Sequence, residues 1–447
     1  MNIVFYSTCS TVFDGTTFHY ENLPLNKSKL ETLIQLYPEH NFSIVAQLPG
    51  MFLLDLCGNE LNQKSEGVKY ELLSPDSTTS EISEKIISLN PSIAISITGF
   101  FRPFDWQGIK DGLIAEKLIQ NGIKVLANSV QTQTICFDKI LTQNFLETNN
   151  FSVPKSISVN HELFWAERNN LDVKENLYKE YIFSKLHQMN YPIIIKDATG
   201  LSSFGMEVVT TFNQAKAFLT SKKNNGNKLI QELIEGQQFG VEVFGTQENY
   251  MISSPFQFSV NQYKITSPKQ SVKAGPVINK NFNDDKFYSE LNRLCTLLNI
   301  NGSAQIDLVY SNSKWFIIEI NPRLSGMTNT VCQSYNTNYL ELLLKAALNI
   351  KLNKDDYEKQ CVLSLKLPLI DEKTKNNLLK HSFIKQINQT KNDCAKQHRE
   401  AGFCEIIIEG NNSLELKLNL DIIKQKYSEL IDQGFYTQSI QLLKDME

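Results

Sequence analysis

The sequence lacks the features that mark membrane, secreted and nucleic-acid-binding proteins. It contains no apolar run of about 18 residues, the length that a membrane-spanning helix needs. Its start, MNIVFY, lacks the basic residues and the small-residue cleavage site of a secretory signal. Acidic residues outnumber basic ones by 48 to 44, so there is no positive surplus for binding nucleic-acid phosphates. We therefore expect a cytoplasmic protein that acts on small molecules, with no nucleic-acid or membrane partner.

Cysteine pairs, internal repeats and low-complexity segments are also missing. The eight cysteines are scattered without a C-x-x-C pair, which argues against a zinc site and against a disulfide framework. The six histidines are equally dispersed and predict no metal site. The composition, 41% hydrophobic and 21% charged, is that of ordinary soluble globular proteins. At roughly 150 residues per domain, the length predicts about three domains.

Short apolar runs alternate with helical patterns in the first part of the chain, which predicts βα units and a parallel sheet. The runs are NIVFYS at the start, FSIVAQL from Phe42, SIAISIT from Ser92 and IKVLANS from Ile123. Residues 111–121 have apolar positions at helical spacing, and Gly122 suits the end of that helix.

The middle of the chain changes to a pattern that predicts antiparallel strands. Before these strands, the pattern predicts one amphipathic helix at residues 130–151 and a polar helical segment at residues 161–190. The runs YPIIIKD, EVVTTF, LIQEL and FGVEVFG are then rich in β-branched and aromatic residues. Residues 261–280 read as a mobile polar loop, and residues 284–298 as a helix. From about residue 371 we expect a helix, a strand at residues 403–410 and a helix near residues 421–431.

Asp307 and Glu319 form the strongest local signal, in the segment SAQIDLVYSNSKWFIIEINPR. If a loop at residues 312–314 joins two antiparallel strands, Asp307 lies opposite Glu319 and Gln305 lies opposite Asn321, all on one face. Like charges directly opposed destabilise a sheet, so a divalent cation held by oxygen ligands explains the pair. A solvated hairpin with unrelated acids is the alternative. It is disfavoured because Glu319 lies inside the apolar run FIIEI, where a lone carboxylate is costly to bury.

A second signal is the segment PIIIKDATGLSSFGM, in which a lysine ends an apolar strand and a glycine-serine loop follows. Such a loop offers hydroxyls and backbone N–H groups to phosphate oxygens. The segment is not a Walker loop, because it lacks G-x-x-x-x-G-K-[ST]. About 30 residues further on, LIQELIEGQQFGVEVFG places a glycine turn between two strands.

These three blocks, in this order, resemble the ATP-grasp superfamily from about residue 123 to residue 343. The resemblance implies an α/β (α+β) protein with the ATP-grasp fold: an N-terminal parallel α/β domain, antiparallel lid and core sheets, and a small C-terminal α+β segment. We place the N-terminal domain at residues 1–128 and the ATP-grasp domain at residues 129–370. Its lid would span about residues 190–232 and its catalytic core about residues 233–370. The C-terminal segment would span residues 371–447.

The resemblance also implies the nucleotide site. Two lysines, Lys139 in CFDK and Lys196 in IIIKD, would hold the phosphates of ATP. The glycine-rich lid contributes Ser202, Ser203 and Gly205, and the adenine-binding hinge consists of Gln231, Glu232, Leu233 and Ile234. The position that usually carries a ribose-binding glutamate is Gln238 here, which can still hydrogen-bond a hydroxyl.

The resemblance assigns the metal and the chemistry to the hairpin. Asp307, Glu319 and Asn321 match the magnesium ligands, with Glu319 bridging two Mg²⁺ ions that Mn²⁺ can replace. The γ-phosphoryl group would move to a carboxylate, and an amine would then attack the acyl phosphate. Arg323 and Gly326 would be catalytic residues, with Arg323 stabilising the oxyanion.

The choice among ligases depends on a few positions. LSGMT after Arg323 is similar to the P-G-M-T turn of D-alanine–D-alanine ligases, but those enzymes carry an arginine where this chain has Gln305. The arrangement is more similar to bacterial L-amino-acid (dipeptide) ligases and to the biotin-carboxylase-like group. An ATP-grasp ligase that extends a peptide, cofactor or metabolite, a biotin-carboxylase-like enzyme and a non-catalytic ATP-binding protein stay open as alternatives.

Several further residues are expected at the substrate site. They are Glu242 on the strand GVEVF, for which amine binding and a structural role both stay open, Lys273 in the loop at residues 261–280, and Ser325 and Thr328 after the metal strand. Lys264 and Lys269 lie in the same loop, and the loop STCSTVFDG follows the first strand at a sheet edge where such folds bind ligands. We expect amino-acid or peptide substrates and, by analogy with the family, a homodimer.

Overall fold

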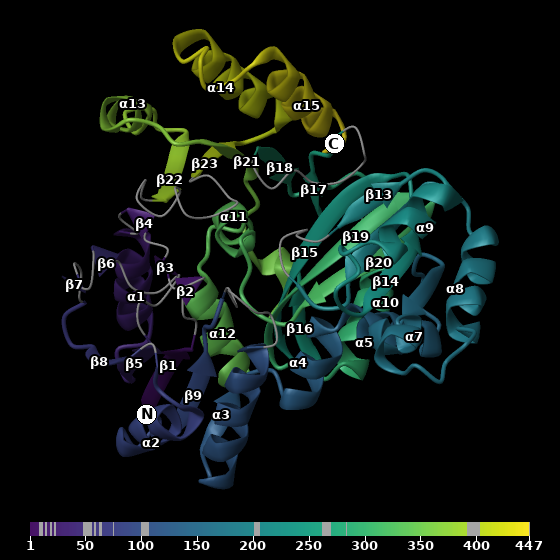
Figure 1. The fold of residues 1–447 in the computed structure, drawn as a ribbon. Helices are drawn as coiled ribbons and strands as arrows, with labels where there is room; N and C mark the ends of the chain where they lie inside the picture. Colours follow the sequence, from purple (N-terminus) through teal and green to yellow (C-terminus); the bar gives the residue numbers. More distant parts are fainter. Residues whose placement is uncertain are drawn as a thin grey trace.

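The computed structural model of the chain describes most of the 447 residues (Figure 1). The described ranges are 1–8, 12–13, 16–17, 20–21, 24–47, 56–57, 60–61, 65–74, 76–99, 107–200, 206–261, 270–282, 284–390 and 403–446. Within them, no helix is both long enough and apolar enough to cross a lipid bilayer.

The N-terminal part is a five-stranded parallel sheet in the order β10-β9-β1-β5-β8, as the alternating pattern predicts. Its strands are β1 (Asn2–Ser7), β5 (Asn41–Gln47), β8 (Lys69–Leu73), β9 (Ile93–Ser96) and β10 (Lys124–Leu126). Its helices are α1 (Pro24–Leu36), α2 (Thr79–Ser88) and α3 (Gly108–Gln120). The edge strand β8 was not predicted, because KYELL has no apolar run and no fully buried residue. Two-residue strands form two further pairs: β2 (Val12–Phe13) with β3 (Thr16–Thr17), and β6 (Leu56–Cys57) with β7 (Glu60–Leu61).

The predicted helix at residues 130–151 is wrong as a single element, because it is two helices. They are α4 (Val130–Phe137) and α5 (Lys139–Thr148). Asp138, in an extended conformation between them, accepts hydrogen bonds from the N–H groups of Ile140 at 2.8 Å and Leu141 at 3.1 Å. An aspartate in this arrangement is a favourable N-cap and starts a new helix. Lys139 is therefore the first residue of α5.

The middle of the chain forms a four-stranded antiparallel sheet in the order β11-β14-β12-β13, and Figure 1 shows it with α8 and α9 on one side of the molecule. The strands are β11 (Ser156–Val159), β12 (Ile193–Asp197), β13 (Glu207–Val209) and β14 (Lys228–Glu232). The helices are α6 (His161–Phe164), α7 (Ala166–Asn169), α8 (Leu177–His187) and α9 (Phe212–Thr220). They enclose an apolar cluster of their own around Phe164 and Ile195.

The third sheet has ten strands in the order β20-β19-β15-β17-β18-β21-β23-β22-β4, with β16 paired to β15. Its strands are β4 (Tyr20–Glu21), β15 (Gln237–Thr246), β16 (Asn249–Ile252), β17 (Phe256–Phe258), β18 (Ser271–Gly275), β19 (Gly302–Ser311), β20 (Lys314–Asn321), β21 (Cys361–Pro368), β22 (Ile384–Thr390) and β23 (Phe403–Gly410). The strands after residue 371 thus continue the same sheet as the predicted metal hairpin.

The remaining helices pack around this sheet. They are α10 (Asp285–Leu297), α11 (Thr328–Ser334), α12 (Tyr339–Ala347), α13 (Glu372–Leu378), α14 (Ser413–Lys426) and α15 (Gln433–Lys444), with a short 3₁₀ helix at Lys354–Asp356. The predicted helix at residues 421–431 has wrong bounds. Asn412 caps the N-terminus of α14, and Asp432 begins a separate helix by capping Phe435 N–H at 2.8 Å.

The predicted mobile loop at residues 261–280 contains a core strand, which corrects that prediction. β18 pairs with β17 on one side and with β21 on the other. Its sequence SVKAG has only one long apolar residue, so its strand character depends on its two neighbours. Lys264 and Lys269 lie outside the described residues.

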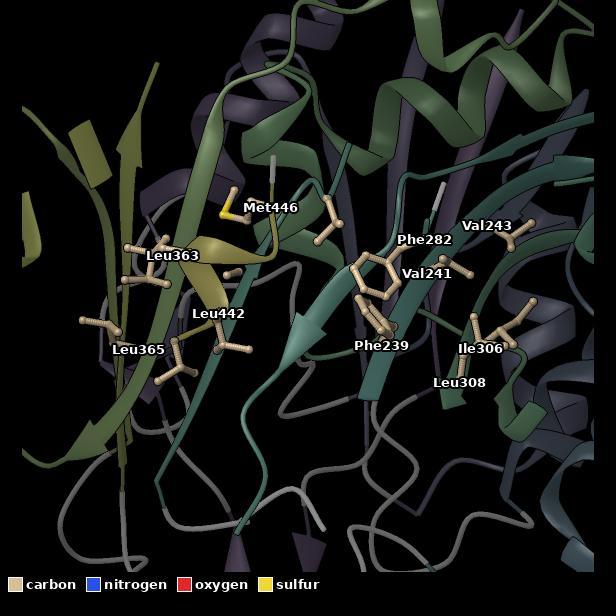
Figure 2. Packing of buried hydrophobic residues seen from close by; sticks show 14 of the residues in the cluster. Phe239, Val241, Val243, Phe282, Ile306, Leu308, Leu363, Leu365, Leu442 and Met446 are labelled. Atoms are coloured by element: carbon tan, nitrogen blue, oxygen red, sulfur yellow. The ribbon is translucent and has the colours of Figure 1, made fainter. Parts of the chain in front are cut away.

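Successive side chains on a strand alternate, so the two faces of the large sheet differ. One face packs into the main apolar core, and the other carries polar residues on β15 and β19 as well as apolar residues such as Phe244 and Val362 of a second cluster. Figure 2 shows the apolar face, where Phe239 and Val241 of β15 lie near Ile306 and Leu308 of β19 in the core. The C-terminal helix α15 covers part of the same core with Leu442. The alternating residues of β15 and β19 therefore share the opposite, polar face. They are Gln238, Gly240, Glu242, Gln305 and Asp307.

Candidate active site

The hairpin of β19 and β20 pairs Asp307 with Glu319 and Gln305 with Asn321, as the sequence predicts. The predicted connection at residues 312–314 is wrong, because the turn has two residues, Asn312 and Ser313, both with positive φ. A two-residue turn by itself would shift the pairing by one position. A bulge restores it: Leu308 lies opposite Ile317 while Asp307 lies opposite Glu319, which leaves Ile318 as the extra residue. The turn and the bulge together bring the two acids onto one face.

The pairing of Asp307 with Glu319 brings two acidic groups together at one site. Burial, and secondly the nearby Glu319, raise the pKa of Asp307 to about 7. The side-chain amide of Gln305 donates a hydrogen bond to Asp307 Oδ1 at 2.8 Å. Asn321 adds an amide oxygen two residues after Glu319, on the same face. The position therefore offers a cluster of oxygen atoms that a cation would stabilise.

Two lysines from different elements converge on this carboxylate pair. The ammonium of Lys139, at the start of α5, lies 3.6 Å from Glu319 Oε1 and donates to the carbonyl of Gly200 at 2.7 Å. Lys196 lies on β12 of the four-stranded sheet and is buried. Burial lowers the pKa of Lys196 to about 8, against an opposing effect of Glu319. Both lysines thus interact electrostatically with the metal hairpin.

The residues expected around the adenine lie at the end of β14, in one extended stretch. The side chain of Gln231 is buried and donates to Gln143 of α5 at 2.8 Å. The carboxylate of Glu232 accepts from the N–H of Asn190 at 2.9 Å, and Leu233 N–H donates to the carbonyl of Pro192 at 3.1 Å. Ile234 follows. The contacts that these residues make with a nucleotide stay a prediction.

The structure describes only some of the other residues expected at the nucleotide. Gln238 lies on the polar face of β15, opposite Val309 in the register and in line with the metal hairpin. Gly200 is in contact with Lys139. Ser202, Ser203 and Gly205 lie outside the described residues.

Arg323 lies directly beside the metal hairpin. Its Nη2 donates to Asn321 Oδ1 at 3.0 Å and its Nη1 donates to the carbonyl of Leu324 at 3.2 Å. These two contacts hold the guanidinium beside the end of β20. The turn after it exposes Gly326, the second predicted catalytic residue, while Ser325 and Thr328 are buried.

The expected substrate residues form two connected groups. Glu242 is fully buried and accepts hydrogen bonds from the hydroxyls of Ser325 and Thr328, so these three contact one another and not the solvent. Lys273 donates to the carbonyl of Gly326 at 3.3 Å.

Sequence reasoning missed the partner of Lys273. Glu405 on β23 lies 3.6 Å from its ammonium and accepts from the Ser364 hydroxyl at 3.0 Å. The alternation in FCEIIIEG places Glu405 on a strand face, but only the pairing of β21 with β23 and β18 shows which face it is.

The donor set fits Mg²⁺. Two carboxylates and an amide oxygen are hard ligands, and Mg²⁺ is usually bound by one or two carboxylates together with water and substrate phosphates. Within the described ranges, no group of three or more His, Cys, Asp or Glu side chains could hold a metal. A site with few protein ligands, next to two lysines, suits a metal that is shared with phosphate.

Comparisons with known proteins agree with this geometry. Residues 136–327 match the family described as the ATP-grasp domain. The carbamoyl-phosphate synthase of Methanobrevibacter smithii is 22% identical over 252 residues, which are 55% of this chain and 62% of that protein. The D-alanine–D-alanine ligase of Wigglesworthia glossinidia brevipalpis is 28% identical over 243 residues, which are 51% of this chain and 60% of that protein. The match thus spans less than two thirds of either relative's length.

Solved structures share the fold over nearly the whole chain. The crystal structure of an L-amino acid ligase from Bacillus licheniformis superposes with a TM-score of 0.65 at 13% identity, covering 95% of this chain and 97% of that one. The domain match thus places an ATP-grasp domain at residues 136–327, and the shared fold extends over nearly the whole chain.

Proposed function

We propose that the protein is an ATP-dependent carboxylate–amine ligase. The observation that carries this proposal is the convergence of Lys139 and Lys196 on the opposed carboxylates of Asp307 and Glu319. Two cations suit the phosphates of a nucleotide, and an acidic pair suits the metal that accompanies them.

In the first step, the lysines hold the terminal phosphates of ATP in line with the carboxylate of the first substrate. That carboxylate oxygen attacks the γ-phosphorus, the bond to the bridging oxygen breaks, and ADP leaves. When bound at Asp307, Glu319 and Asn321, Mg²⁺ or Mn²⁺ neutralises phosphate charge during this transfer. The product of the step is an acyl phosphate.

In the second step, an amine attacks the acyl carbonyl, loses a proton and displaces phosphate. The carbonyl oxygen becomes negative before the phosphate leaves. The guanidinium of Arg323, held beside the hairpin by Asn321 and Leu324, supplies donors for that oxygen. The exposed position of Gly326 leaves room for the acyl group near Arg323.

Amino acids or peptides are the proposed substrates, in an acid–amino-acid ligase reaction. The similarity in fold to an L-amino acid ligase over 97% of its chain supports this class. A homodimer and a cytoplasmic location belong to the same proposal. An enzyme that extends a peptide, cofactor or metabolite would use the same chemistry with another amine acceptor. A non-catalytic ATP-binding protein would bind ATP but release no ADP.

The similarity to carbamoyl-phosphate synthases supports a second candidate. In that case the activated carboxylate would be bicarbonate, as in a biotin-carboxylase-like reaction. The two candidates differ in what they need besides ATP, so one assay separates them.

The test is a screen of amino acids in pairs for ADP and phosphate release, with the product identified by mass. Release that depends on two amino acids, with a product mass equal to their sum less one water, supports the dipeptide reaction. Release with bicarbonate alone would favour the second candidate. AMP as the sole nucleotide product would contradict the acyl-phosphate mechanism.

A further inference from the structure

The carboxylate of Glu242 lies beneath the turn that follows Arg323. Glu242 comes from β15, on the polar face, and its side chain is fully buried. Its two oxygens accept hydrogen bonds from Ser325 Oγ and, at 3.1 Å, from Thr328 Oγ1. Both hydroxyl residues are 1% exposed. Glu242 therefore contacts the turn from inside the protein and does not line the surface that a substrate can reach.

The hydroxyls also hold the backbone of the turn. Ser325 Oγ accepts the N–H of Met327 at 2.9 Å, and Thr328 Oγ1 accepts the N–H of Ser325 at 2.8 Å. Each hydroxyl hydrogen is then directed at Glu242. An ionised Glu242 accepts both hydrogens, whereas a protonated one would leave a buried hydroxyl without an acceptor. The ionised form of Glu242 thus completes a network that fixes residues 325–328.

The turn has a second support on its outer side. The Lys273 ammonium donates to the carbonyl of Gly326, and Glu405 of the C-terminal strand β23 pairs with Lys273. Gly326 is the exposed residue between the two supports. Arg323 lies two residues before this turn, and its Nη1 donates to the carbonyl of Leu324, so the guanidinium and the turn are linked through Leu324.

The charged surroundings of Glu242 come from three other elements. Arg323 after β20 and Lys273 on β18 are cations, and Cys332 on α11 is a buried thiol. Burial raises the pKa of Glu242 to about 8, while the two hydroxyls and then the two cations oppose that shift. Burial also raises the pKa of Cys332 to about 12, so the thiol stays neutral beside Glu242.

We propose that Glu242 is a positioning residue of the ligase, which holds the turn at residues 325–328 so that Gly326 and Arg323 face the acyl group during transfer. It does not bind the substrate. This role rests on the proposed function, because it presupposes an acyl group at Arg323. It differs from amine binding, one of the two roles that the sequence leaves open for Glu242.

The experiment compares Glu242→Gln and Glu242→Ala with the wild-type chain in turnover and in amide hydrogen exchange of the peptide at residues 323–330. Above about pH 8, where Glu242 is ionised, the glutamine variant cannot accept both hydroxyl hydrogens as the carboxylate does, so we expect kcat about tenfold lower there. The alanine variant releases the turn, and we expect kcat about 100-fold lower, the cost of a small misplacement at a reacting centre. The KM for ATP should stay within about twofold, because the lysines are unchanged. Exchange at the Ser325 and Met327 amides should accelerate in parallel.

Matched variants separate positioning from general stability. Glu409→Gln removes a carboxylate that holds α11 from β23 through Gln333 at 2.7 Å, and Ser334→Ala removes a buried hydroxyl from the same helix. Both should lower the unfolding temperature while kcat and the exchange at residues 323–330 stay near wild type. Thr328→Val keeps the shape of the side chain and removes the hydroxyl, whereas Thr328→Ser keeps the hydroxyl. We therefore expect kcat to fall further in Thr328→Val than in Thr328→Ser.

Two results would overturn the proposal. One is a Glu242→Ala variant with unchanged kcat and unchanged exchange. The other is a KM for the amine that rises while kcat stays constant, which would mean that Glu242 binds substrate directly. A wild-type chain that releases no ADP with any amino-acid pair would refute the proposed function instead, and the exchange measurement would still decide whether Glu242 holds the turn.

Discussion

Replacing Arg323 is the most direct test of the chemistry. The guanidinium contacts Asn321 Oδ1 at 3.0 Å and the carbonyl of Leu324 at 3.2 Å, so its plane is held at two points. Arg323→Ala removes every donor of the guanidinium from the proposed oxyanion. Loss of one oxyanion donor costs about 100-fold to 1,000-fold in kcat, and we expect a loss in that range. Arg323→Lys keeps the charge but removes the planar fork, so we expect a smaller loss of about tenfold.

The distribution of the effect matters as much as its size. The oxyanion exists only as the amine attacks, so the loss should appear in kcat, with little change in the affinity for ATP. The assay is ADP release with saturating amino acids, beside calorimetric titration of each variant with nucleotide. Arg293→Ala is the control, since Arg293 lies on α10, where it pairs with Glu290 at 3.0 Å and donates to the carbonyl of Asn149, neither of which is a predicted site residue. Full turnover in Arg323→Ala, or complete loss of its ATP binding, would refute the role.

Three other outcomes can be measured on the same protein. Asp307→Asn and Glu319→Gln should each lower turnover by about 100-fold or more at limiting Mg²⁺ while the fold persists, and near-normal rates would place the metal elsewhere. Phe239→Ala should lower the free energy of unfolding by about 3–5 kcal/mol in denaturant titrations, because Phe239 is fully buried in the core; a change below about 1 kcal/mol would contradict the packing. The raised pKa of Glu242 means that the folded chain binds a proton that the unfolded chain releases between about pH 4.5 and about pH 8, so stability from this group falls as the pH rises through that window. Across this window, the unfolding temperature of the wild-type chain should fall relative to that of Glu242→Gln. If the unfolding temperatures of the two chains change with pH in parallel, the raised pKa of Glu242 is disproved.

Local pattern was sufficient for the elements whose character depends on short stretches of sequence. The parallel strands of the N-terminal sheet are apolar runs, and β1, β5, β9 and β10 follow the prediction. The pairing of Asp307 with Glu319 was also predicted, although by the wrong turn. The predicted loop at residues 312–314 gives the same pairing as a two-residue turn with a bulge at Ile318, because each adds one residue to the β20 side. The three-part division of the chain stays a prediction.

The predictions from sequence were wrong where a single capping residue or a contact with another element determines the local structure. The break between α4 and α5 depends on one N-cap at Asp138, inside a stretch that is amphipathic on both sides. The strand β18 has little apolar pattern of its own and forms because β17 and β21 lie beside it. For Glu242 the sequence left amine binding and a structural role open, since period-two alternation gives the face of a strand but not what covers that face.

The sequence by itself determined which residue types stand together on short elements: the acid pair and amide of one hairpin, a lysine at the end of an apolar strand, and the alternating apolar face of β15. Sequence spacing specifies such neighbours because helix and strand periodicity are local. Only the tertiary structure decided that Lys139 reaches Glu319, that Ser325 and Thr328 close over Glu242, and that Glu405 of β23 reaches Lys273. These contacts join residues far apart in the chain, and burial against partners from other elements selects them, which no local pattern records.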